Sequence, residues 1–238
     1  MKKLLKDVLR GDGLKFRAVR MSGLGVFQTG GVSVLRLIGN VILARLLFPE
    51  AFGLMALVAL IQGGASLFSD VGIKDALVRS PRGDDRAFRD TAWTLQILRG
   101  FLLAGIVAAL AGPFAALYDE EMLAPLVTVA TLQFVITGFN STKMAHARRH
   151  LAVGRLTVMM LMGKVVAVIT TVLLAWATGS VWSLVIGGLV SSAFQCALSH
   201  LYLPGKLDRP RLERAAVREI FGLGRFILVG TAATYVSN

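Results

Sequence analysis

Long runs of apolar residues, separated by short polar segments, dominate the chain. Six runs reach the length of about 20 residues that a helix needs to cross a ~30 Å hydrocarbon core. They cover residues 21–47, 51–73, 91–118, 122–142, 156–178 and 181–203. A seventh run begins near Phe226, and its 13 residues up to Asn238 rise only about 20 Å as a helix. The pattern predicts an all-α polytopic membrane protein with six spans and the truncated start of a seventh, so we expect the chain to be a fragment of something longer.

Composition supports this interpretation. Of the 238 residues, 55% are hydrophobic and 17% charged, whereas an ordinary soluble domain has about 25% charged residues. A net charge of +12 would indicate a nucleic-acid partner in a soluble protein. In a membrane protein it indicates loops that face an anionic leaflet, so we expect the bilayer as partner and no nucleic acid. The single cysteine, Cys196, excludes an intramolecular disulfide.

The basic residues predict the orientation. Of the 26 lysines and arginines, 22 lie before the first span, between the second and third, between the fourth and fifth, or after the sixth. The three alternate connections, residues 48–50, 119–121 and 179–180, contain none. Because positively charged segments stay on the cytoplasmic side, we expect a cytoplasmic N-terminus and three short turns outside.

Four segments follow from these patterns. Residues 1–20 form a basic leader, in which Leu4, Leu5, Val8 and Leu9 recur at the spacing of a short interfacial helix. The six-helix transmembrane lobe covers residues 21–203. A cytoplasmic linker covers residues 204–225, and the start of the seventh helix covers residues 226–238.

Three cations lie within the predicted spans, where ionisable groups are rare and usually face a bundle interior or a water-filled cavity. These are Arg36, Arg99 and Lys164. Neutral polar residues accompany them at Asn40, which shares a helix face with Arg36, and at Gln62 and Gln133. Together they predict a cationic cavity that suits an anionic ligand such as a phosphate or pyrophosphate. The alternative is that the long side chains of Arg99 and Lys164 extend to the inner headgroups.

Two clusters of potential metal ligands are less persuasive. His146 and His150 have the spacing of helical zinc ligands, but Ala147 replaces the general-base glutamate, and the neighbouring Arg148 and Arg149 oppose a bound cation. We interpret this segment as a basic surface next to the membrane.

The aspartates Asp84, Asp85 and Asp90 are loosely spaced and interrupted by arginines, which is typical of a solvated loop. No nucleophile–base pair or phosphate-binding glycine loop is present in the sequence. We therefore expect no enzymatic activity, no cofactor and no metal site.

Two motifs resemble a known family. The region of residues 40–57 resembles the first-to-second helix region of bacterial polysaccharide exporters, the lipid-linked oligosaccharide flippases of the multidrug/oligosaccharidyl-lipid/polysaccharide (MOP) exporter superfamily. The family pattern there is close to L-A-R-x-L-x-P-x-x-[FY]-G, matched here by Leu43, Ala44, Arg45, Leu47, Pro49, Phe52 and Gly53. A second match is the Asp70-x-Gly72 pair, followed by Val78-Arg79.

The resemblance implies a MATE-like fold of two six-helix lobes around a cationic central cavity that opens alternately to each side. Such proteins move undecaprenyl-diphosphate-linked sugar units from the inner to the outer leaflet of the bacterial plasma membrane, without covalent chemistry. Arg36, Arg99 and Lys164 would then contact the diphosphate or acidic sugars; charge and depth, and no family motif, select these residues. The chain supplies only the N-terminal lobe, so transport requires a second lobe or a second copy.

Three alternatives stay open. A multidrug extruder of the same superfamily would favour an acidic residue deep in the first lobe, and none is visible at such a depth. A membrane enzyme acting on polyprenyl-linked sugars needs carboxylates at a membrane face, where only the aspartates between residues 84 and 90 are available. A non-transporting component of a polysaccharide assembly complex is compatible with a chain that has one lobe.

Overall fold

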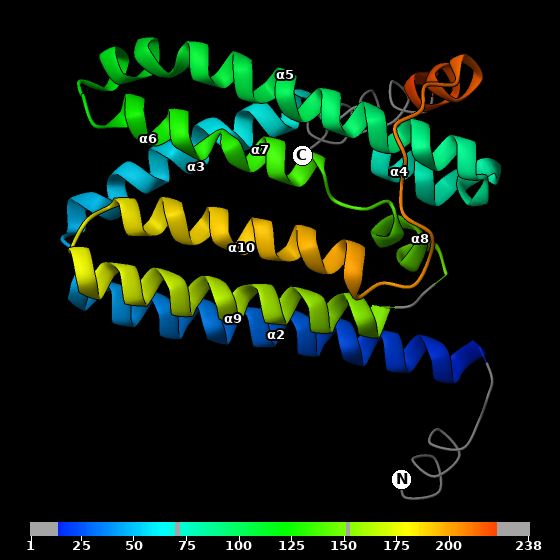
Figure 1. The fold of residues 1–238 in the computed structure, drawn as a ribbon. Helices are drawn as coiled ribbons and strands as arrows, with labels where there is room; N and C mark the ends of the chain where they lie inside the picture. The colour runs from blue at the N-terminus through cyan, green and yellow to red at the C-terminus, as the bar shows by residue number, and fades with distance from the viewer. Residues whose placement is uncertain (1–13, 70–71, 151–152, 223–238) are drawn as a thin grey trace, which may run out of the picture.

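The computed structural model describes residues 14–69, 72–150 and 153–222, and this part of the chain contains helices and no strands (Figure 1). The all-α polytopic membrane fold is therefore confirmed. The elements in chain order are α2 (Leu14–Leu46), α3 (Pro49–Ser69), α4 (Ile73–Arg79), the short 3₁₀ helix η1 (Pro81–Asp84), α5 (Arg86–Tyr118), α6 (Leu123–Ala130), α7 (Leu132–Gly138), α8 (Lys143–Arg149), α9 (Val153–Thr178) and α10 (Trp182–Leu201). Residues 214–222 form a further helical stretch.

Four of these helices, α3, α5, α9 and α10, are long and apolar enough to cross a membrane, and a fifth span results if α6 to α8 count as one bent span. The 33-residue α2, which contains the first predicted span, is also long enough to cross a membrane. Residues 14–20, which we assigned to the leader, belong to the same helix as the first span. The rest of the leader and the seventh helix lie outside the described residues.

The long helices pack in a row in which α2 lies along α9, α9 along α10, α10 along α7 and α7 along α5, while α3 packs on α5 and α6. Figure 1 shows the three short turns, at residues 47–50, 119–122 and 179–181, together at one end of the molecule. The connections α4, η1 and α8 and residues 204–222 gather at the other end. The basic connections and the turns without lysine or arginine are therefore separated along the bundle axis.

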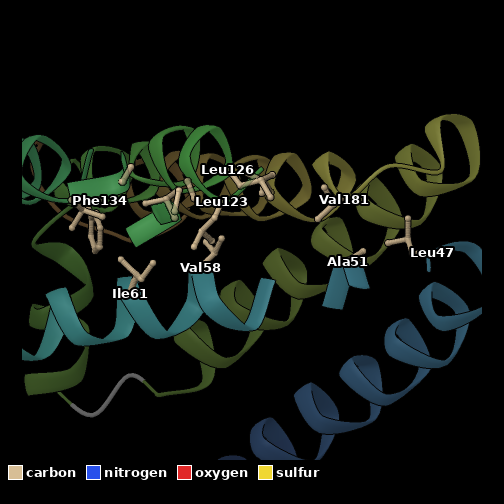
Figure 2. Packing of buried hydrophobic residues seen from close by; sticks show 14 of the residues in the cluster. Leu47, Ala51, Val58, Ile61, Leu123, Leu126, Phe134 and Val181 are labelled. Carbon is tan, nitrogen blue, oxygen red and sulfur yellow. The ribbon is translucent and has the colours of Figure 1, made fainter. Parts of the chain in front are cut away.

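The core of the bundle lies toward the end with the short turns. Figure 2 shows Leu47 and Ala51 near Val181, and Val58 and Ile61 facing α6 and α7. Residues of α6 complete this cluster, among them Leu123 and Leu126, which are fully buried. Because lipid tails are as apolar as these side chains, close packing rather than exclusion of water holds such helices together.

The predicted span over residues 122–142 is not one continuous helix. The helix is broken at Thr131 and ends at Gly138, and α8 then continues at an angle of 60°. The Gln62 amide donates to the Ala130 carbonyl over 2.7 Å and stabilises the first break from outside the helix. At the second, the Gln96 amide donates to the carbonyls of Thr137, Gly138 and Asn140 over 3.1–3.3 Å, which satisfies acceptors that a helix end leaves open.

A second, smaller unit forms at the end opposite the short turns. We call α4, η1, α8 and residues 204–222 the cytoplasmic assembly, after the predicted orientation. Its apolar centre combines residues of four segments that are distant in sequence: Ile73, Ala76, Leu77, Phe88, Ala92, Ala145, Ala216 and Ile220. The described part of the predicted linker therefore packs against the lobe.

Candidate functional site

A polar pocket of about 190 Å³ lies where α3, α4, α5 and α7 meet. We call it the inner pocket. It is lined by Ser66, Lys74, Gln96, Arg99, Gly100, Leu103, Phe134, Thr137 and Gly138. Because ligand pockets for drug-sized molecules are about 300–1,000 Å³, this one fits a charged headgroup rather than a whole oligosaccharide.

Two glycines bring its walls together. A side chain at Gly100 would begin 2.6 Å from the Phe134 carbonyl oxygen, and one at Gly138 would begin 3.1 Å from the Gln96 carbonyl oxygen. Small residues of this kind let helix backbones approach closely, here α5 and α7. The contact places Arg99, the residue before Gly100, at the crossing point of the two helices.

The charges around the inner pocket determine which class of ligand it favours. Arg99 is half-buried, and one of its guanidinium nitrogens donates to the Ser66 carbonyl over 3.4 Å. Lys74 reaches the same pocket from the exposed side of α4. The described residues that line it include these two cations and no carboxylate. Because a guanidinium binds phosphate oxygens through a planar pair of donors, the arrangement favours a phosphate-type anion.

The predicted site residues separate into two groups. Arg99 lines the inner pocket, whereas Gln62, Gln133, Arg36, Asn40 and Lys164 do not. Gln62 uses its amide to stabilise the break between α6 and α7. Gln133 is half-buried on α7.

Arg36 and Lys164 lie on the neighbouring helices α2 and α9. A side chain at Gly31 would meet Leu161 at 3.2 Å, and one at Gly39 would meet Val168 at 3.3 Å. Arg36 and Lys164 fall between these contacts and therefore lie at a similar level of the helix pair. Arg36 and its neighbour Asn40 are exposed, and Lys164 is half-buried. The structure thus brings two of the predicted cations to one helix pair and the third to the pocket beside α7.

A match to a family decides the class of protein. The family model described as polysaccharide biosynthesis protein matches residues 42–238. The chain belongs to this family. No curated protein and no solved structure matches it. Family membership and the apolar helices establish a membrane protein with a role related to polysaccharide biosynthesis. The matched region contains Gln62, Arg99, Gln133 and Lys164, whereas Arg36 and Asn40 precede it.

The sequence analysis did not select two polar residues that line the inner pocket, Gln96 and Lys74. Gln96 lies three residues before Arg99, on the same face of α5, and this spacing was the signal that could have found it. Lys74 carried no such signal, because its proximity to Arg99 arises only when α4 packs against α5. The i, i+4 spacing of Asp70 and Lys74 in the sequence also favours an ion pair, and Asp70 lies outside the described residues.

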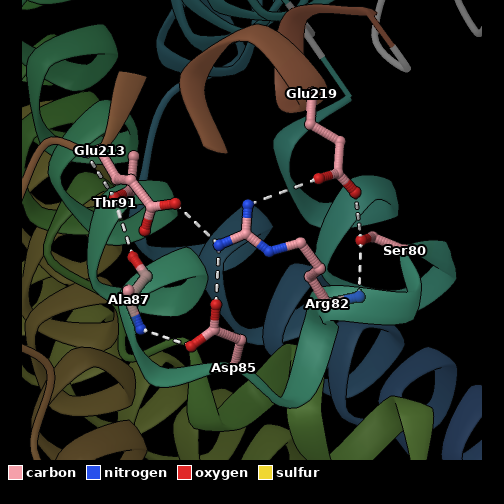
Figure 3. A network of polar contacts seen from close by, with 7 residues as sticks. All are labelled: Ser80, Arg82, Asp85, Ala87, Thr91, Glu213 and Glu219. Carbon is pink, nitrogen blue, oxygen red and sulfur yellow. Dashed lines mark hydrogen bonds and ion pairs between the residues drawn. The ribbon is translucent and has the colours of Figure 1, made fainter. Parts of the chain in front are cut away.

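Arg82, which lies in the region that the family model matches, joins distant parts of the cytoplasmic assembly (Figure 3). The Arg82 guanidinium donates to the carboxylates of Asp85 and Glu213, each over 2.8 Å, and lies 3.8 Å from Glu219. Hydrogen bonds to these partners raise the pKa of Arg82, and the bond from Arg82 lowers the pKa of Asp85. Asp85 also accepts from the Ala87 amide over 3.1 Å and thereby caps α5.

Our prediction that Asp90 lies in a solvated loop is wrong. Asp90 is buried, and its carboxylate accepts from the Arg209 amide over 3.1 Å. The cause is the docking of residues 204–222, which covers the first turns of α5. Asp208 makes a similar contact with the start of α8, where it accepts from the Ser141 hydroxyl over 2.6 Å and from both the amide and the hydroxyl of Thr142.

Proposed function

We propose that this chain forms the N-terminal lobe of a flippase that moves undecaprenyl-diphosphate-linked oligosaccharide units across the bacterial inner membrane, with its N-terminus in the cytoplasm. The observation that carries the proposal is the inner pocket, in which Arg99 and Lys74 converge in a chain of the polysaccharide biosynthesis protein family. A pocket of this size and charge suits the diphosphate, while the sugars stay outside it.

The pocket lies toward the end with the basic connections, which we expect to be cytoplasmic. An anionic headgroup entering from that side meets Lys74 first and Arg99 deeper between α3 and α5. Transport then requires rocking against a second lobe or a second copy, and Arg36 and Lys164 are candidates for contacts with the substrate on the α2–α9 side. The chemistry is binding and release, without a covalent step.

The multidrug alternative fits the pocket less well, because a cationic drug would be repelled by two cations. The enzyme alternative needs available carboxylates at the membrane face. Asp85 is occupied by Arg82 and the α5 cap, and Asp90 is buried against Arg209. The charge of the pocket therefore favours the flippase over the extruder, and of the three aspartates only the exposed Asp84 is left for the enzyme alternative.

The test is charge reversal in the complete protein, expressed in its own bacterium in place of the wild-type gene. Arg99→Glu places a carboxylate beside the bound diphosphate, so we expect surface polysaccharide to fall to background and lipid-linked intermediates to accumulate on the cytoplasmic leaflet. Arg99→Lys keeps the charge but loses the paired donors, so we expect reduced output.

A matched pair on α4 serves as control. Lys74 lines the pocket and Arg79, five residues later, does not. We expect Lys74→Gln to reduce export and Arg79→Gln to leave it unchanged. Normal surface polysaccharide from Arg99→Glu at wild-type protein levels in the membrane would overturn the proposal. If Arg99→Glu instead led to a lipid-linked precursor that lacks an enzymatic modification, and no export intermediate accumulated, the enzyme alternative would be favoured.

A further inference from the structure

Three potential metal ligands converge on the cytoplasmic assembly, outside the inner pocket. Asp84 ends η1, His146 lies in α8 and His150 follows α8 directly. One ligand atom from each lies within 4.8 Å of the other two. The Asp84 Oδ1 atom is 3.1 Å from His146 Nδ1 and 3.0 Å from His150 Nε2.

The state of His146 is the unusual feature. Its Nδ1 atom is buried and, among the described residues, has no partner with hydrogen-bond geometry, although the Asp84 oxygen is close. A buried polar atom without a partner costs free energy. The His150 ring lies beside it, with ring centroids 4.4 Å apart, so both imidazoles present nitrogen atoms to the same small volume.

We propose that Asp84, His146 and His150 form a binding site for a divalent transition-metal ion, with zinc as the best-suited ion. Two imidazoles and one carboxylate are a common three-ligand set for zinc, with water in the fourth position. Ligand bonds of about 2.0–2.1 Å around a tetrahedral ion separate donor atoms by about 3.3 Å. The observed 3.0 and 3.1 Å separations from Asp84 need only small adjustments, and the two histidine nitrogens, within 4.8 Å of each other, can reach this separation by side-chain rotation.

Arg149 holds the Asp84 carboxylate through the oxygen that does not contact the histidines. The Arg149 Nε atom lies 3.2 Å from Asp84 Oδ2, the oxygen that faces away from the histidines. The same guanidinium donates to the carbonyls of Val78 and Ser80 over 3.0 and 2.5 Å, which fixes its position. Metal-binding carboxylates are commonly held by a hydrogen-bonding partner of this kind.

The charge argument that led us to expect no metal here changes in the structure. Arg149 pairs with Asp84 and neutralises it instead of pointing at an ion. Arg148 lines a different pocket, together with Lys74 and Gln96. Arg89 is the cation that still acts on His146, and its positive charge limits the affinity for a metal ion.

The site would connect two cytoplasmic segments that join different pairs of spans. Asp84 belongs to the connection between α3 and α5, and the histidines belong to the connection between α7 and α9. Asp84 and His150 are exposed, so an ion can enter without unfolding. Binding should therefore stabilise the cytoplasmic assembly and leave the bundle unchanged.

The experiment uses the complete protein in detergent, carrying Cys196→Ser to remove the thiol and stripped with a chelator. Zn²⁺ is titrated in competition with a chromophoric chelator at neutral pH. We expect one equivalent to bind in the micromolar range, and a large excess of Mg²⁺, which prefers oxygen ligands, not to displace it. His146→Ala, His150→Ala and Asp84→Asn should each weaken binding at least about tenfold.

His200→Ala is the matched control. His200 lies at the same end of the molecule and contacts the Phe139 carbonyl, but it is not part of the cluster, so its removal should leave zinc affinity unchanged. Because a histidine variant can fail to fold, Co²⁺ absorption of the Cys196→Ser protein gives an independent readout, with the visible bands of a four-coordinate site expected. Absence of stoichiometric uptake, or equal affinities in the His146→Ala and His200→Ala proteins, overturns the proposal.

Discussion

The membrane-spanning bundle and the cytoplasmic assembly are both held by buried apolar residues, but the surroundings of those residues differ. In the bundle, apolar side chains lie on both the inside and the outside: Leu126 is fully buried, while Leu37 and Leu102 are 67% and 64% exposed. In the cytoplasmic assembly, Phe88 and Ile220 are fully buried, and the charged Arg82 guanidinium lies over the Phe88 ring.

This difference determines which substitutions matter. Burial of apolar surface stabilises by about 25 cal/mol per Å² only when the alternative is water. That condition holds in the cytoplasmic assembly, whereas helices in the bundle gain from close backbone contact. Loss of volume should therefore be most damaging in the assembly, and gain of volume at a glycine contact should be most damaging in the bundle.

The largest effect is expected from Ile220→Ala. Removing a fully buried isoleucine side chain typically costs about 2–5 kcal/mol, which is enough to release the helical stretch of residues 214–222 from the lobe. Limited proteolysis of the complete protein should show faster cleavage within residues 204–222. Phe221→Ala, at the neighbouring position, is the matched control because the Phe221 side chain is 48% exposed. Equal cleavage of both variants would contradict the distinction between the two regions.

A smaller effect is expected from Gly100→Ala in the bundle. The new methyl group would lie 2.6 Å from the Phe134 carbonyl oxygen, and overpacking of this kind costs about 1–3 kcal/mol. The melting temperature in detergent should fall. Gly105→Ala, on the same helix with no atom within 4 Å of the new methyl, should be neutral or stabilising by up to about 1 kcal/mol. If both variants have the same melting temperature, the close contact between α5 and α7 does not limit the stability of the bundle.

The apolar runs and the basic connections predicted most of the fold, because span length and charge bias are local properties of the sequence. Four predicted spans correspond to helices α3, α5, α9 and α10 with ends displaced by a few residues. The break in the fourth span was not predictable in this way, since it depends on Gln62 reaching the Ala130 carbonyl from another helix.

The candidate site also combines residues that local sequence properties indicate with residues that only tertiary packing brings together. Arg99 could be selected from its depth in a span, but its neighbour Lys74 belongs to a segment that reads as a charged loop. The cluster of Asp84, His146 and His150 joins positions more than 60 residues apart, and the docking of residues 204–222 buries Asp90. Local spacing indicated only the pair of His146 and His150; the approach of Asp84 and the burial of Asp90 arise from tertiary packing.

The smallest effect is expected from acid, and it should act on the cytoplasmic assembly alone. Arg82 lowers the pKa of Asp85 in the folded protein below its ordinary value, which is about 3.9 in the unfolded chain. A lowered carboxyl pKa gives stability that is complete above the unfolded value and is lost as the pH falls through the folded value. The assembly should therefore stay docked at neutral and mildly acidic pH and loosen only below about pH 4.

Cleavage within residues 204–222 by an acid-active protease, followed against pH, measures this loosening. Asp85→Asn retains a side-chain oxygen to cap α5 but cannot titrate, so we expect more cleavage than in wild type at mildly acidic pH and a weaker dependence on pH. Asp84, whose pKa is lowered chiefly by its hydrogen bond with His150, remains, so part of the acid response should persist. An unchanged pH curve for Asp85→Asn would mean that the contribution assigned to Asp85 is wrong.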